Sequence, residues 1–162
     1  MPGVGGSKSE NVELCPTRLP VDEADLLDQA FRGAAAERRS ALDLLRGGGD
    51  CPPLKAKIEG ELQKISDRAI QILSRYLVPH GTDTETTVVF QKMLADHHGY
   101  MAEITHGEAK SSAAVNAQLT YHEAAVTARA GLPRHSNIRR GMQIQRYQHG
   151  WSRRSRSSDA AV

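Results

Sequence analysis

Aromatic residues, cysteines and long apolar runs are all scarce in this chain of 162 residues. Aromatics make up 4% of it, so the core must come from Leu, Ile, Val, Met and Ala, a composition that favours helices. The cysteines, Cys15 and Cys51, form no CxxC or Cys/His cluster, which is typical of reduced intracellular thiols. No run approaches the roughly 20 apolar residues of a membrane span, and the first ten residues contain no apolar stretch typical of a signal peptide. We expect a cytoplasmic or nuclear protein with no membrane partner.

The chain also lacks a strong excess of charge of one sign. Lys and Arg number 21 and Asp and Glu 19, which gives a formal net charge of +2. This balance provides no strong field to attract nucleic acid, so charge-driven binding must be local. Near the C-terminus Arg153, Arg154 and Arg156 have no aromatic neighbour beyond Trp151. We expect a solvated tail there, and weak nucleic-acid binding is the alternative.

Apolar residues recur at three- and four-residue steps, and strand-type alternation is absent from the sequence. This pattern predicts an all-α fold, an antiparallel helical bundle with short connections, over residues 21–148. Residues 1–20 are expected to form a disordered leader, and residues 149–162 a disordered basic tail rich in Ser and Arg. The predicted helices and their end signals are Asp22 to Gly47; Leu54 to Pro79; Glu85 to His106, capped by Gly107; Ser111 or Ser112 to Ala130; and Ser136 to Gln148.

The predicted third helix contains a motif of chemical interest. The sequence there is Lys92-Met93-Leu94-Ala95-Asp96-His97-His98-Gly99-Tyr100-Met101-Ala102-Glu103. It matches the pattern Lys-Met-x-Gly-Asp-x-x-Arg-Tyr-x-Ala-Glu, in register, at Lys92, Met93, Asp96, Tyr100, Ala102 and Glu103. That pattern belongs to the phosphate-binding helix of the 14-3-3 family, which this segment resembles. Gly99 stands where the family carries an arginine that holds phosphoserine.

Further motifs resemble the same family in the same order. Residues 26–40 are similar, without a gap, to the family helix Leu-Leu-Ser-Val-Ala-Tyr-Lys-Asn-Val-Val-Gly-Ala-Arg-Arg-Ser, with Arg32 at its lysine and Arg39 at its second arginine. The others are Lys57-Ile58-Glu59-Gly60-Glu61-Leu62, Tyr76-Leu77-Val78-Pro79, Tyr121-His122-Glu123-Ala124 and the segment from Leu132 to Gly141. Together they cover residues 19 to 145, which correspond to the middle of a family member. The resemblance therefore implies the central helices of a 14-3-3 domain.

That coverage has consequences for assembly. We expect two parts of the family fold to be missing. One is the first two helices, which supply one side of the dimer contact, and the other is the last helices, which form the apolar wall of the peptide groove. Lys57 and Glu61 match positions that pair with the first helices of a partner subunit. We expect a monomer or a weak heterodimer with a complete family member, and a plain i, i+4 pair on one helix is the alternative for these two residues.

The resemblance assigns phosphate binding to Arg32, Arg39 and Tyr100, and contacts with the peptide backbone to Lys92 and Gln145. Arg32 and Arg39 are seven residues apart, so they point from the same face of a helix. A guanidinium group suits bidentate recognition of phosphate.

Ordinary structural roles are the alternatives for the same residues. Asp28 lies four residues before Arg32 and Asp43 four after Arg39, and such i, i+4 ion pairs contribute only about 0.3 to 0.5 kcal/mol each. Lys92 has Asp96 at the same spacing. For Tyr100 the alternative is an ordinary helix tyrosine at the edge of the core.

The implied function is a non-catalytic adaptor in signal transduction that binds phosphoserine or phosphothreonine peptides of phosphorylated proteins. Loss of the arginine at Gly99 removes a charge-assisted hydrogen bond of roughly 1.5 to 3 kcal/mol, which weakens phosphate binding about ten- to a hundred-fold. The alternative is a phosphate-independent helical interaction module or a degenerate family fragment. In addition, Arg154-Ser155-Arg156-Ser157 resembles the Arg-Ser-x-phosphoserine motif that the family's grooves recognise, and predicts a regulatory ligand when Ser157 is phosphorylated.

Metal and catalytic chemistry are not indicated. His97 and His98 are adjacent, so on a helix they diverge by about 100 degrees and cannot share an ion as an i, i+4 pair does. No nucleophile, base and orienting group occur at a recognisable spacing, and no Gly-rich phosphate loop lies between a strand and a helix. We expect no cofactor, no metal and no enzymatic activity.

Overall fold

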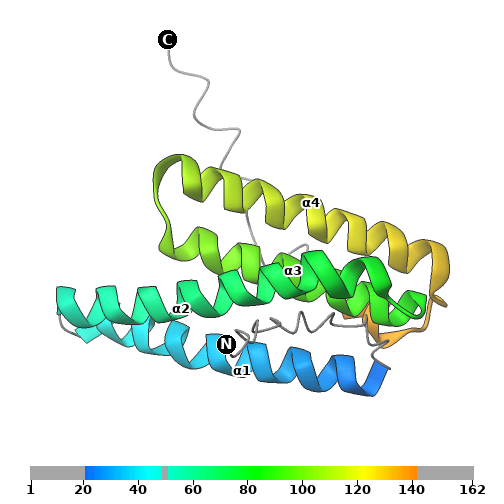
Figure 1. Ribbon diagram of the computed structural model, residues 1–162, viewed down its shortest axis with the longest axis horizontal. Coiled ribbons are helices and arrows are strands. Elements are labelled where there is room, and N and C mark those ends of the chain that lie inside the picture. Colours follow the sequence, from blue (N-terminus) through cyan, green and yellow to red (C-terminus); the bar gives the residue numbers. More distant parts are fainter. Residues whose placement is uncertain (1–20, 49–50, 142–162) are drawn as a thin grey trace, which may run out of the picture.

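The computed structural model describes residues 21–48 and 51–141. These residues form no strand, and four long helices follow one another: α1 (Val21–Gly48), α2 (Pro52–Ile72), α3 (Thr84–Ile104) and α4 (Gly107–Gly131). Each helix runs antiparallel to the one before it (Figure 1). The predicted all-α antiparallel fold is confirmed.

Helix α3 is the central helix of the described residues. It packs against both α1 and α2 and, over most of its length, against α4. Helices α1 and α2 form an antiparallel pair, and α4 lies on the other side of α3 from α1 (Figure 1). A helix enclosed in this way must bury side chains all around its axis, and the buried residues of α3 accordingly include the polar Asp96 and His97.

The core consists of apolar clusters along α3. Where α1, α2 and α3 meet, Phe90, Leu73 and Met93 are buried with Ala24 and Ala69. The other two clusters are Leu42, Leu62, Ala35 and Ile104, which Tyr100 borders, and Val88, Ala124 and Ala128, which join α3 to α4. Full burial of a Leu or Phe side chain stabilises the fold by about 1.5 to 3 kcal/mol. The alanines of α4 have little side-chain volume, so this helix can approach α3 closely.

The end of α2 differs from a plain helix. After Ile72 the chain forms a π-helical turn, η1 (Leu73–Leu77), and a 3-10 turn, η2 (Val78–His80). Helical structure therefore stops close to Pro79, as predicted, because proline offers no backbone N–H for the next turn. The π turn changes the rotation per residue, and the Tyr76 side chain within this turn is exposed.

The connection from α3 to α4 is shorter than predicted. Thr105 is extended, and Gly107 is the first residue of α4, not the cap of α3. The φ of Gly107 is +59°, a conformation that glycine adopts without steric cost and that turns the chain within two residues. Ser111 therefore lies inside α4, where its hydroxyl donates to the Gly107 carbonyl at 3.4 Å. The predicted start of this helix at Ser111 or Ser112 is wrong.

Helix α3 has a side-chain cap that the sequence analysis did not identify. Asp83 Oδ1 accepts the backbone N–H of Thr86 at 2.8 Å, which satisfies one of the free N–H groups of the first turn. The same hydrogen bond lowers the pKa of the Asp83 carboxyl. This cap fixes the start of α3 at Thr84.

The predicted fifth helix is only partly described. Residues 137–141 are helical, and Ile138 packs against both the Phe90 cluster and the Val88 cluster. The remainder of that helix, including Gln145, lies outside the described residues, as do the predicted leader, the basic tail with Ser157, and Cys15.

Candidate functional site

Arg39 joins α1 to α3. Its guanidinium donates from Nε to Glu103 Oε2 at 2.7 Å and from Nη2 to Glu103 Oε1 at 2.8 Å, a two-pronged ion pair. Burial by itself lowers the pKa of Arg39, but the hydrogen bond and charge of Glu103 outweigh it and raise the pKa. The guanidinium therefore stays charged and fixed in orientation, and one of its edges is hydrogen-bonded to the Glu103 carboxylate.

Tyr100 lies beneath this guanidinium. The central carbon of the Arg39 guanidinium is 4.7 Å from the centroid of the Tyr100 ring, a cation–π distance. Burial raises the pKa of the Tyr100 hydroxyl, and the charge of Asp96 raises it further, while Arg39 and Arg32 oppose the shift. The hydroxyl is therefore neutral and able to donate a hydrogen bond at physiological pH, and no described residue is hydrogen-bonded to it.

His97 supports the Tyr100 ring from within the core. Its own ring meets Tyr100 edge-on at 5.3 Å between centroids, and meets Phe31 of α1 in the same manner at 5.6 Å. His97 Nδ1 lies 3.4 Å from the Ser66 hydroxyl. Burial lowers the pKa of His97 to about 4, so the ring is neutral near pH 7 and packs as an aromatic residue.

Asp96 is the centre of a second polar cluster, between α3 and α4. Lys92 Nζ donates to Asp96 Oδ2 at 2.7 Å, and the Tyr121 hydroxyl of α4 donates to Asp96 Oδ1. Burial, followed by the charge of Asp96, raises the pKa of Tyr121, which keeps that hydroxyl protonated. The i, i+4 pair considered for Lys92 and Asp96 is present.

Arg32 lies two turns before Arg39 on α1. It forms an ion pair with Asp28, as the i, i+4 spacing allowed. The corresponding pair of Arg39 with Asp43 does not form, because Arg39 binds Glu103 and Asp43 accepts a hydrogen bond from Arg46 at 2.9 Å instead. The charges of Arg39 and Arg32 both oppose the rise in the pKa of Tyr100, and the Arg39 guanidinium also lies over the Tyr100 ring.

Gly99 lies on α3 beside Tyr100. A Cβ atom built at this position meets no atom within 4 Å, so the structure has room for a side chain at the third basic position of the family pattern. Gln145, the second residue predicted to contact peptide backbone, lies outside the described residues.

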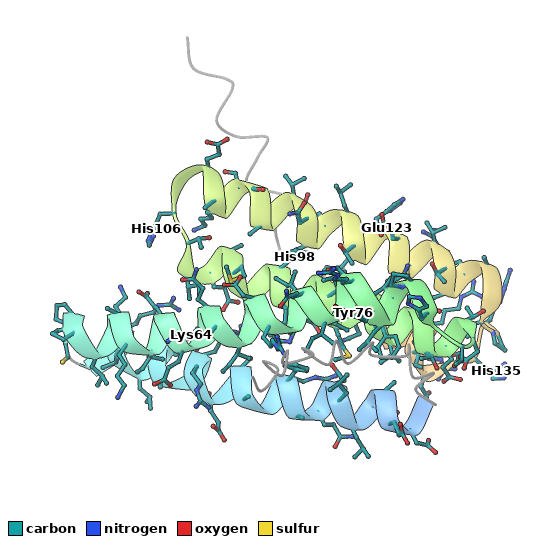
Figure 2. All side chains as sticks on the ribbon, in the orientation of Figure 1. Lys64, Tyr76, His98, His106, Glu123 and His135 are labelled. Atoms are coloured by element: carbon teal, nitrogen blue, oxygen red, sulfur yellow. The ribbon has the colours of Figure 1, made fainter. Side chains whose placement is uncertain are left out.

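The histidines are spread across the molecule. His106 and His135 lie at opposite ends, at the turns before and after α4, and His98 lies on α3 between them (Figure 2). Among the described residues no three His, Cys, Asp or Glu side chains lie close enough together to hold a metal ion. No helix of this same part of the chain is both long and apolar enough to cross a bilayer.

Sequence spacing does not predict the roles of Glu103, Asp96 and Tyr121. Glu103 and Asp96 belong to the motif on α3, but no partner was predicted for Glu103, and Asp96 was assigned only to Lys92. The partner of Glu103 is 64 residues away in sequence and that of Asp96 on α4 is 25 residues away. Local spacing carries no signal for such pairs.

The fold and these contacts define an all-helical protein in which arginine, tyrosine and carboxylate side chains are gathered between α1 and α3. A profile of the family described as "14-3-3 protein" matches residues 9–146, and the chain belongs to the 14-3-3 family. The match begins at residue 9, ten residues before residue 19, where the resemblance was expected to begin.

Relatives from plants and yeast are similar over most of the chain. The 14-3-3-like protein GF14-E of Oryza sativa subsp. japonica is 34% identical over 139 residues, which cover 78% of this chain and 53% of the relative. The 14-3-3-like protein B of Hordeum vulgare is 33% identical with the same coverage. Protein BMH2 of Saccharomyces cerevisiae is 30% identical over 146 residues, covering 78% of this chain and 51% of the relative. The chain thus spans about half the length of the relatives that it matches.

Proposed function

We propose that this chain is a non-catalytic adaptor that binds phosphoserine or phosphothreonine peptides of signalling proteins in the cytoplasm or nucleus. Arg32, Arg39 and Tyr100 hold the phosphate, and Lys92 and Gln145 contact the peptide backbone. The observation that carries the proposal is the stacking of Arg39 on Tyr100 across α1 and α3. Two charged arginines on one face of α1 and a neutral hydroxyl on α3 are donors that suit a tetrahedral anion.

Phosphate binding at this site requires rearrangement of ion pairs. Arg39 and Glu103 are each about one-third exposed, so a ligand reaches the guanidinium from solvent and water can solvate the carboxylate that it displaces. Gly99 supplies no third cation. We therefore propose that the chain prefers phosphorylated peptides, with an affinity about ten- to a hundred-fold below that of a site with the additional arginine.

A titration with paired peptides tests this proposal. The probes are a fluorescent Arg-Ser-x-phosphoserine peptide and the same peptide without phosphate, and the measurement is fluorescence anisotropy. The chain should bind the phosphorylated peptide more tightly, and Arg39→Gln should abolish that preference. Arg46→Gln is the matched control, because Arg46 is two turns further along α1 and pairs with Asp43 instead of Glu103. The phosphate-binding role would be contradicted if the unsubstituted chain and the Gly99→Arg variant each bound the phosphorylated and the unphosphorylated peptide with equal affinity.

The second candidate is a helical interaction module that does not read phosphate. The outer surface of α4 favours it, because Val115, Leu119 and Val126 are exposed and their spacing places them on one face of the helix. Equal binding of both peptides, lost when Leu119 is changed to Ser, would support this role over the first.

For assembly we propose a monomer or a weak heterodimer with a complete family member. Glu61 accepts a hydrogen bond from Arg38 of α1 at 3.4 Å, and the described structure has no ion pair between Glu61 and Lys57. The Lys57 side chain is thus available to pair with a partner subunit. Sedimentation velocity of the chain should give a monomer at micromolar concentration, and a tight homodimer there would rule this assembly out.

A further inference from the structure

Asp28 and Arg32 form an ion pair of unequal exposure. The Asp28 side chain is 13% exposed, whereas that of Arg32 is 51% exposed. Within the described part of the chain, Arg32 is the only cation paired with this carboxylate. The arginine can therefore be solvated without its partner, but the carboxylate has little access to water and depends on the guanidinium.

Asp28 is also a departure from the family pattern. In the helix that residues 26–40 resemble, the corresponding position is serine, a neutral residue. This chain therefore combines an added carboxylate on α1 with a missing arginine at Gly99 on α3. Both differences change the charge around Arg32, Arg39 and Tyr100 in the same direction.

We propose that Asp28 is a specificity-determining residue of the phosphate site, which holds Arg32 and thereby lowers the affinity of the site for a phosphate dianion. The inference rests on the proposed function and names the residue that regulates it. Asp28 is not a ligand contact. It acts by competing with phosphate for the same guanidinium.

The physical basis is the choice that a phosphate faces at Arg32. If phosphate takes the guanidinium, it leaves the nearly buried Asp28 carboxylate without its counter-charge. If Asp28 keeps the guanidinium, phosphate binds beside a carboxylate and meets like-charge repulsion. Glu103 imposes a smaller cost at Arg39, since it is 34% exposed and water can solvate it after displacement. Arg39 is thus the principal phosphate contact, and Arg32 is restrained.

The charges around the site agree with this competition. Each of the three cations is paired with a carboxylate in the ligand-free chain: Arg32 with Asp28, Arg39 with Glu103, and Lys92 with Asp96. Three positive and three negative charges leave no net excess to attract a dianion. Removal of the Asp28 charge creates an excess of one positive charge at the guanidinium that is most exposed.

The experiment compares Asp28→Asn with Glu59→Gln, in the unsubstituted chain and in a Gly99→Arg background. Glu59 forms an i, i+4 ion pair with Lys55 on α2, so its substitution makes the same change of charge in a similar pair on another helix. The probes are the labelled Arg-Ser-x-phosphoserine peptide and its unphosphorylated form. We expect Asp28→Asn to tighten phosphopeptide binding about ten-fold in both backgrounds and to leave the unphosphorylated peptide unchanged. Glu59→Gln should change neither.

A second pair of variants separates competition from a merely structural effect. Asp28→Ser, which restores the family residue, should show the same gain, and adding Arg32→Gln to Asp28→Asn should remove it, because the gain passes through that guanidinium. Thermal melting establishes that each variant is folded. The inference is overturned if phosphopeptide affinity is unchanged or lower in the Asp28 variants, if both peptides gain equally, or if the gain persists without Arg32. If even Gly99→Arg shows no preference for the phosphorylated peptide, the proposed function itself fails.

Discussion

Substitution of Gly99 tests the structure of α3 and the chemistry of the site at the same time. Gly99 lies in the interior of α3, and a Cβ atom there meets nothing within 4 Å. Glycine in a helix interior costs about 1 kcal/mol relative to alanine, so Gly99→Ala should raise the free energy of unfolding by about that amount. For a chain of this size the melting temperature should rise by about 2 to 4 °C. Affinity for either peptide should not change, because a methyl group donates no hydrogen bond.

Gly99→Arg adds a cation to the same backbone change. Arginine has nearly the helix propensity of alanine, so Gly99→Arg should raise the free energy of unfolding by an amount similar to that of Gly99→Ala. In the complex it can donate a charge-assisted hydrogen bond to phosphate, worth roughly 1.5 to 3 kcal/mol, or about ten- to a hundred-fold in affinity. The gain should appear with the phosphorylated peptide alone.

Thermal melting by circular dichroism and anisotropy titration of the paired peptides measure both effects. A Gly99→Ala variant that melts below the unsubstituted chain would refute the open space at this position. A Gly99→Arg variant that binds the phosphopeptide no more tightly than Gly99→Ala would refute the assignment of position 99 to the phosphate site.

Two further predictions concern stability. His97 is neutral in the folded chain with a pKa of about 4, whereas an exposed histidine titrates near 6.5, so the unfolded chain binds more protons between these values. The free energy of unfolding should therefore fall by up to about 3 kcal/mol as pH drops from about 6.5 to 4. The variant His97→Phe, which keeps aromatic contacts with Phe31 and Tyr100, should show a smaller fall over this pH range when stability is measured by urea denaturation. An unchanged fall would exclude His97 as the source of the pH dependence. In the core, Leu62→Ala should cost about 2 to 5 kcal/mol by the same denaturation assay, because Leu62 is fully buried, while Leu44→Ala, at 77% exposure, should stay within about 0.5 kcal/mol; similar losses for the two would contradict the described packing of α1 and α2.

The helical class and most helix positions could be predicted from the sequence. Leu62, Leu73, Phe90 and Met93 recur at helical spacing, and the same residues are buried in the structure. Such periodicity is legible in sequence because a helix fixes the direction of each side chain from its position alone. End signals were less reliable. Ser111 has the chemistry of an N-cap, but the turn at Gly107 had already begun the helix four residues earlier.

The contacts of the site required the tertiary structure. Arg39 had Asp43 one turn away on its own helix, and the structure pairs it with Glu103, which is 64 residues distant. The motif on α3 placed Tyr100 next to Gly99, but only packing placed the Tyr100 ring beneath the Arg39 guanidinium. Sequence spacing fixes which side chains share a face of one helix, whereas the partner of that face depends on how whole helices pack. The local sequence therefore indicates which residues belong to the site, whereas the packing of α1 against α3 determines which of them form pairs.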